Sequence, residues 1–137
     1  MNAARLAGPI AGLLTVLTTC ASSCSLVTGV DDDEFRIHVD SLSIVGRIDP
    51  ADTLHLVVHG PAGPDGCYGF DRIASIRKTH AIELTVWGRH RVGRNIACTQ
   101  SPVYLHQAWA VAPPLPEPFM VIVHQPDGSR LQRSVLP

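Results

Sequence analysis

Seven histidines in a chain of 137 residues are the first side chains here that could do chemistry. Clustered neutral imidazoles bind zinc or copper, so His38, His55 and His59 are candidate metal ligands, and strand pairing could bring His106 and His124 near them. His55 and His59 are four positions apart, which separates them by about 13 Å on a straight strand at about 3.3 Å per residue. They cannot then hold one ion together. We therefore predict no bound cofactor and keep metal binding through His55, His59 and His38 as the alternative.

Motifs through which common enzyme classes assemble their reactive groups do not occur in the sequence. It contains no Gly-x-Ser-x-Gly elbow, no phosphate-binding glycine loop and no His-Glu-x-x-His zinc motif. The acidic residues outside Asp31–Glu34 are scattered, and the four cysteines are better explained by lipid attachment and a disulfide. We therefore predict no enzymatic activity.

Two charged segments are candidates for binding ions or polyanions. "DDDE" (Asp31–Glu34) could attract calcium, but it lacks the spaced Asp, Asn and Gly residues of a calcium loop and is typical of a solvated tether. "RHRVGR" (Arg89–Arg94), with Arg77, Lys78 and His80, could meet a polyanion, but the two groups fall at opposite ends of one expected hairpin. With a net charge of −1 and 17% charged residues, the chain is not expected to bind nucleic acid.

The N-terminal residues Met1–Thr19 have the pattern of an export signal. Arg5 supplies a positive end, and "LAGPIAGLLTVL" supplies an apolar stretch of about a dozen residues, short of the roughly 20 that a transmembrane helix needs. Small residues and two cysteines follow this stretch. We predict a signal peptide over residues 1–23 that is removed on export.

The end of this leader resembles that of bacterial lipoproteins, in which a short box ending in cysteine is cut and the cysteine receives a lipid. Leu17-Thr18-Thr19-Cys20 has the leucine of such a box, and Ala21-Ser22-Ser23-Cys24 has its small residue directly before the cysteine. Cutting before Cys24 leaves one lipid site and one cysteine pair, whereas cutting before Cys20 leaves an odd thiol. The resemblance implies a lipid on Cys24 or Cys20 and anchoring in a bacterial cell envelope, on its periplasmic or surface face. An ordinary secretory cut near Ala21–Ser23, without lipid, is the alternative.

From Phe35 onward, apolar residues recur at every second position, which is typical of half-buried strands. Strands are expected within residues 34–46, 53–60, 69–79, 81–90, 102–111, 118–125 and 129–136, with a bend near Asp40 and Ser41 where the alternation changes phase. About seven short strands, punctuated by Pro and Gly and without an amphipathic helix, predict an all-β sandwich. "APPLPEP" (Ala112–Pro118) is expected to cross between the sheets. We therefore predict a polar tether over residues 24–34 and one β-sandwich domain over residues 35–137.

The remaining cysteines, Cys67 and Cys98, have a natural place in this strand order. Cys67 precedes the first strand of the hairpin over residues 69–90, and Cys98 follows the second, so both lie toward its open end. Export supplies the oxidising environment that a disulfide needs. We predict a Cys67–Cys98 disulfide.

Four segments resemble small uncharacterised bacterial lipoproteins that carry an immunoglobulin-like sandwich: "CYGF" (Cys67–Phe70), "IELTVWG" (Ile82–Gly88), "ACTQ" (Ala97–Gln100) and "LPEPFMVIV" (Leu115–Val123). The resemblance implies an immunoglobulin-like fold of about seven strands and an envelope location, and it implies no ligand. We therefore expect a non-catalytic interaction module, anchored to the membrane by its lipid, whose loops or sheet edge contact another envelope component, in the first instance a protein.

Overall fold

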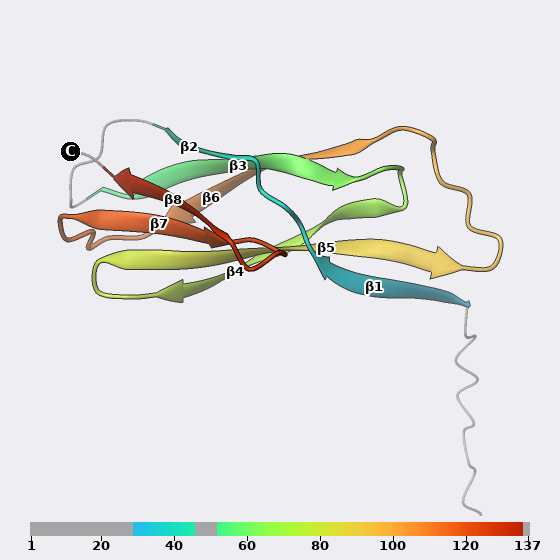
Figure 1. Cartoon of the computed structure of the whole chain (residues 1–137), viewed down its shortest axis with the longest axis horizontal. Coiled ribbons are helices and arrows are strands. Elements are labelled where there is room, and N and C mark those ends of the chain that lie inside the picture. Colours follow the sequence, from blue (N-terminus) through green and yellow to red (C-terminus); the bar gives the residue numbers. More distant parts are fainter. Residues whose placement is uncertain (1–28, 46–51, 136–137) are drawn as a thin grey trace, which may run out of the picture.

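A computed structural model of the chain describes residues 29–45 and 52–135, so the predicted signal peptide and the lipid sites Cys20 and Cys24 lie outside the described residues. All regular structure in the described part is β (Figure 1). The strands are β1 (Val30–Arg36), β2 (Ser41–Val45), β3 (Leu54–Gly63), β4 (Tyr68–Arg77), β5 (Ala81–Gly93), β6 (Val103–Val111), β7 (Phe119–His124) and β8 (Arg130–Val135). Within these residues no helix has the length and apolar character to cross a membrane.

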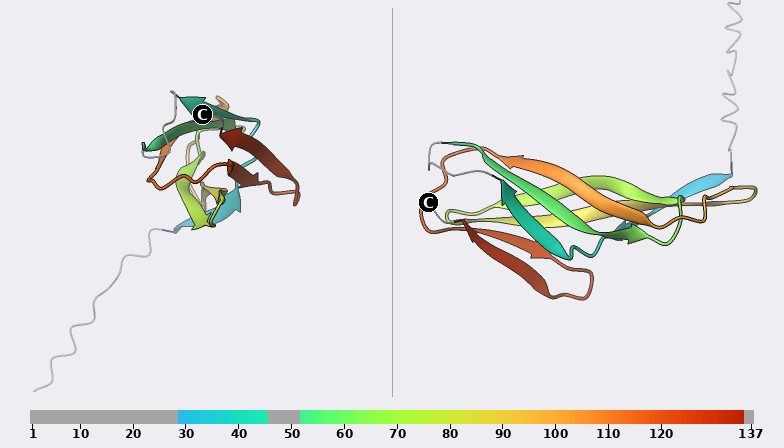
Figure 2. Two further views of the ribbon diagram at one scale, coloured as in Figure 1. Left: turned by 90° about the vertical axis from the view of Figure 1, so that its left-hand side faces the viewer. Right: turned by 90° about the horizontal axis from the view of Figure 1, so that it is seen from above.

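The eight strands form two sheets, which Figure 2 shows as two layers. In the five-stranded sheet, the long strand β5 pairs with β4 along one side and with both β1 and β7 along the other. Strand β1 takes residues Trp87–Gly93 of β5, β7 takes Ala81–Leu84, and β8 extends the sheet beyond β7. The three-stranded sheet has the order β2-β3-β6. Every pair is antiparallel except β5 with β7.

The core lies between the two sheets and consists of the alternate residues that the sequence pattern predicts. The inward positions of β3, β5 and β7 are all buried: Leu54, Leu56, Val58, Ile82, Leu84, Val86, Phe119, Val121 and Val123. Complete burial of an aliphatic or aromatic side chain of this size contributes about 1.5–3 kcal/mol. The all-β fold and these inward positions are as predicted, and the described residues form eight strands against about seven expected.

The first expected strand, within residues 34–46, is two strands that belong to different sheets. Strand β1 ends at Arg36, and the chain crosses to the three-stranded sheet, where β2 begins at Ser41. Ile37 and Val39, each 1% exposed, fill the core on the way. The buried amide of Gln125 accepts a hydrogen bond from the Val39 N–H at 3.0 Å and donates one to the Val39 carbonyl at 2.7 Å. The predicted bend near Asp40 is therefore a crossing whose backbone groups Gln125 satisfies.

The segment expected as a tether, residues 24–34, overlaps the sheet. Strand β1 begins at Val30, ahead of the predicted domain boundary at Phe35, so Asp31–Glu34 are strand residues. They pair residue by residue with β5, from Asp31 opposite Val92 to Glu34 opposite Arg89. Four consecutive acids can lie in a strand here because the facing strand is basic.

The predicted hairpin and crossover both occur. Strands β4 and β5 pair through the turn at residues 78–80, and residues 112–118 run from β6 in one sheet to β7 in the other. The Arg77 guanidinium donates a hydrogen bond to the Ala112 carbonyl at 2.6 Å and another to the Pro114 carbonyl. The hairpin turn and the proline-rich crossover are thereby joined at one end of the sandwich.

Candidate functional site

Cys67 and Cys98 form the predicted disulfide, with their Cα atoms 5.2 Å apart. Cys67 lies between β3 and β4, and Cys98 lies between β5 and β6. Backbone hydrogen bonds hold the same two loops together, from Gly66 N–H to the Thr99 carbonyl at 2.9 Å and from Arg91 N–H to the Cys67 carbonyl at 2.9 Å. The cross-link therefore closes one end of the sandwich.

A group of three potential metal ligands lies at this disulfide. Within residues 29–45 and 52–135, Asp65, Cys67 and Cys98 are the only three such side chains whose ligand atoms lie close together. The two cysteine sulfurs are bonded to each other. A cysteine binds a metal ion as a thiolate, and a disulfide has none. In the oxidised protein this group is a structural cross-link.

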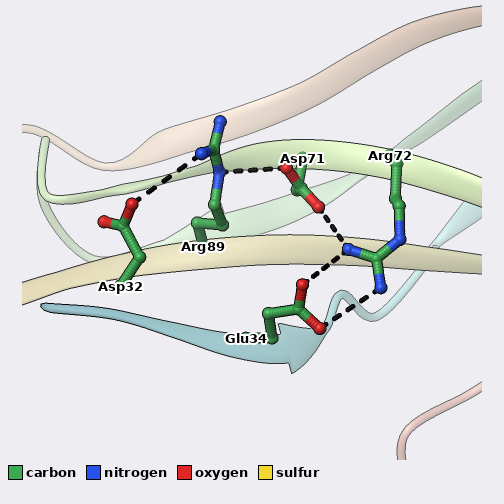
Figure 3. Close-up of polar contacts among 5 residues, drawn as sticks. All are labelled: Asp32, Glu34, Asp71, Arg72 and Arg89. Atoms are coloured by element: carbon green, nitrogen blue, oxygen red, sulfur yellow. Dashed lines mark hydrogen bonds and ion pairs between the residues drawn. The ribbon is translucent and has the colours of Figure 1, made fainter. Parts of the chain in front are cut away.

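Acids of β1, Arg89 of β5 and the neighbouring pair Asp71 and Arg72 of β4 meet on the outer face of the five-stranded sheet (Figure 3). Asp71 bridges two arginines, because its carboxylate lies 3.0 Å from the Arg89 Nε and also accepts a hydrogen bond from Arg72. Arg72 continues to Glu34 through two hydrogen bonds of 2.7 and 3.2 Å, and Arg89 continues to Asp32 at 3.7 Å. We call these five side chains the ion network. Both charged segments of the sequence contribute to it, through Asp32 and Glu34 and through Arg89, so the charge of these three side chains is paired within the sheet.

The ion network also shifts proton affinities. The hydrogen bonds from Arg72 hold the pKa of the Glu34 carboxyl below its ordinary value, and they raise the pKa of Arg72. Arg72 also lies over the Trp87 ring, with its guanidinium carbon 5.3 Å from the ring centroid. Glu34 therefore stays ionised at acidic pH values at which a free glutamate is protonated.

A hollow of about 200 Å³ lies beside the ion network, lined by Asp32, residues 66–70, Arg89 and Arg91. Small-molecule pockets usually have volumes of about 300–1,000 Å³. Two of the charged lining residues, Asp32 and Arg89, already form an ion pair with each other. The hollow is thus small, and part of its charged lining is paired.

All seven histidines lie in the described residues, but His38, His55 and His59, the ligands of the alternative metal-binding hypothesis, do not form a group of three close ligands. His38 lies 3.6 Å from the Asp40 carboxylate. His59 lies instead against His106, which is directly opposite it on β6, with 3.2 Å between their Nδ1 atoms. Extended strand geometry explains why His55 and His59 stay apart, and strand pairing explains why His59 meets His106.

Two further histidines are engaged on the five-stranded sheet. His124 forms a hydrogen bond of 3.0 Å with Glu83, and this bond lowers the pKa of the Glu83 carboxyl. His90 stacks on the Tyr68 ring, with 4.0 Å between the centroids. These two rings serve local packing and pairing.

The outer face of the three-stranded sheet differs in kind from that of the five-stranded sheet. Its outward positions are Ser41, Ser43, Val45, His55, Val57, His59, Pro61, Tyr104, His106, Ala108 and Ala110. None of these residues is Asp, Glu, Lys or Arg, and we call this surface the uncharged face. Tyr104 is 73% exposed and Val45 is 55% exposed, so large apolar groups stand in solvent there.

The rows of the uncharged face follow from the strand register. Ser41, His59 and His106 form one row, and Ser43, Val57 and Ala108 form the next. Strand β6 pairs only with β3 among the described strands, so its second edge carries backbone groups without a strand partner. In the sequence, the outward positions of the three segments are already free of acids, Lys and Arg, but no local pattern indicates that the three segments lie side by side.

The chain matches no protein-family model, no curated protein and no solved structure. The resemblance to immunoglobulin-like lipoproteins therefore stays a prediction.

Proposed function

We propose that this chain is an exported, envelope-anchored interaction module without catalytic activity, and that it binds a protein through the uncharged face. The observation that carries the proposal is the contrast between the two outer faces. One holds the ion network, in which charged groups satisfy each other. The other has no acid, Lys or Arg and exposes Tyr104 and Val45. The buried centres of protein interfaces are depleted in charge and enriched in aromatic residues.

The expected partner is an envelope protein whose contact surface is also poor in charge. A standard interface buries about 800 Å² on each partner, whereas three strands of at most ten residues cover only about 33 by 14 Å in outline. A partner that covers the uncharged face therefore extends past β6, where unpaired backbone groups of Val103–Val111 can receive a further strand. The immunoglobulin-like sandwich of the proposal is a rigid scaffold for such contacts.

Anchoring follows from the leader. A lipid on Cys24 or Cys20 would hold the chain at the membrane, and Cys24 and Val30 are only six positions apart. Such a segment spans at most about 20 Å, so the end of the sandwich where β1 begins would lie near the membrane. Metabolic labelling with a palmitate analogue tests this, with Cys24→Ser, Cys20→Ser and double variants. We expect the label to be lost in one of the two single variants and in the double variant. A wild-type chain without label would mean that the protein is secreted and carries no lipid.

Site-specific photo-crosslinking in the native envelope tests the docking surface. A photoreactive residue at Ala108, near the middle of the edge strand β6 on the uncharged face, should give a discrete protein adduct. The matched control is the same residue at Thr85, which lies on β5 and on the opposite outer face. A charged substitution, Val57→Arg, should abolish the Ala108 adduct while the melting temperature is retained. Equal adducts from both positions, or none from Ala108, would overturn the proposal.

A further inference from the structure

The pair formed by His59 and His106 is the closest approach of two histidine rings described above. The residues are directly opposite each other on β3 and β6, with their Nδ1 atoms 3.2 Å apart and their ring centroids 4.7 Å apart. Both side chains stand on the uncharged face, and the ring planes are inclined at 62°. Their backbones are fixed by a ladder that continues on both sides of the pair.

This separation is that of two nitrogens bound to one metal ion. Zinc binds histidine nitrogen at about 2.0–2.1 Å, so two ligands of a tetrahedral ion lie about 3.3 Å apart. Two neighbouring ligands of a square-planar ion, at the same bond length, lie about 2.9 Å apart. The observed 3.2 Å falls between the two values. From this geometry we propose that His59 and His106 chelate one zinc, copper or nickel ion through their Nδ1 atoms.

The surroundings set the class of metal. Imidazole nitrogen favours zinc, copper and nickel, whereas calcium and magnesium need oxygen ligands, and the uncharged face has no carboxylate. Ser41 is opposite His59 on β2, so its hydroxyl stands in the same row as the two rings. Two protein ligands leave coordination positions for water or for a further ligand from outside the chain.

The site does not rest on the proposed protein docking, because both ligands belong to this chain. Without metal, the pair forms a hydrogen bond in which one ring N–H donates to the other ring. Binding exchanges this hydrogen bond for two metal–nitrogen bonds and needs both rings neutral, so protons compete with the metal. The metal-free pair and the metal-bound pair can therefore be distinguished in solution.

Calorimetric titration of the full-length chain in detergent with Zn²⁺, Cu²⁺ or Ni²⁺ alone tests the site. The titrated chain carries Cys20→Ser and Cys24→Ser, because free thiols outside the disulfide would themselves bind metal. We expect one ion per chain, and a Kd raised at least about tenfold in His59→Ala and in His106→Ala, because loss of even a supporting partner of a metal ligand typically weakens binding about 10–100-fold. The control is His55→Ala, on the same strand and the same face, which should leave the Kd unchanged.

Electron paramagnetic resonance of the Cu²⁺-loaded wild-type chain gives a second readout, which counts the nitrogens bound to the ion. We expect hyperfine coupling from two equatorial nitrogens, reduced to one in either single variant. No saturable binding, coupling to fewer than two nitrogens, or binding that His55→Ala removes and His59→Ala retains would overturn the site. A metal site that is confirmed while the Ala108 crosslink fails would leave metal binding standing and protein docking refuted.

Discussion

Removing the disulfide by the double substitution Cys67→Ala, Cys98→Ala is expected to lower the free energy of unfolding by about 3–4 kcal/mol. The bonded cysteines are 31 positions apart, and the chain-entropy relation gives about 3.7 kcal/mol at 25 °C for a closed loop of that size. The folded state loses little, because the hydrogen bonds of Gly66 with Thr99 and of Arg91 with Cys67 join backbone groups that the substitutions keep. The cost therefore arises in the unfolded chain, which is free to expand.

Urea denaturation, followed by the fluorescence of Trp87 and Trp109, measures this cost. The midpoint should fall, and the dependence of the free energy on urea should become steeper, because an unfolded chain without the cross-link exposes more surface. In thermal unfolding, each kcal/mol of lost stability lowers the melting temperature by about 4–8 °C, so the variant should melt about 12 °C lower or more. The wild-type chain in reductant is the control and should show the same loss.

Two results would refute the reasoning about the disulfide. A loss below about 1 kcal/mol with an unchanged urea dependence would mean that the unfolded chain is not constrained by the bond. A chain that fails to fold at all, beside a typical total stability of about 5–15 kcal/mol, would mean that the bond organises the native loops.

Three further predictions, one of them with a control variant, test how the sandwich is held together. Gln125→Leu leaves both of the backbone groups that its amide pairs buried and unsatisfied, so urea denaturation should show a loss of about 2–5 kcal/mol; wild-type stability would contradict this. Gly60→Ala brings a methyl against the His38 carbonyl oxygen and should cost about 1–3 kcal/mol, whereas Gly69→Ala, which has open space, should be tolerated. The lowered pKa of Glu34 means that the unfolded chain takes up the proton first as the pH falls. The stability that ionised Glu34 contributes is fully present above pH 4.5 and is lost as the pH falls through its lower pKa in the folded chain. The stability difference between wild type and Glu34→Gln should therefore shrink in acid. A difference that persists there would count against the ion network.

Much of the fold was predictable because its signals are local. Alternation with period two identifies inward residues such as Leu56, Leu84 and Val121 without knowledge of their partners. Turn residues between two such segments predict the hairpin of β4 and β5, and the positions of Cys67 and Cys98 at its open end then predict the disulfide. A change of phase near Asp40 marked a break, but a bulge within one strand and a crossing to a second sheet change the phase alike.

The surfaces were decided by tertiary structure, because they depend on which strand pairs with which and in what register. Taken from the sequence alone, Asp31–Glu34 is typical of a solvated tether and Arg89–Arg94 of a solvent-exposed loop. Only the pairing of β1 with β5 brings the two segments side by side. His59 and His106 are 47 positions apart, so no local pattern connects them. A slip of one residue between β3 and β6 would separate the two rings and turn the outward residues of β6 toward the core. The sequence by itself determined which residues could face inward, and the register of distant strands decided which outward residues meet.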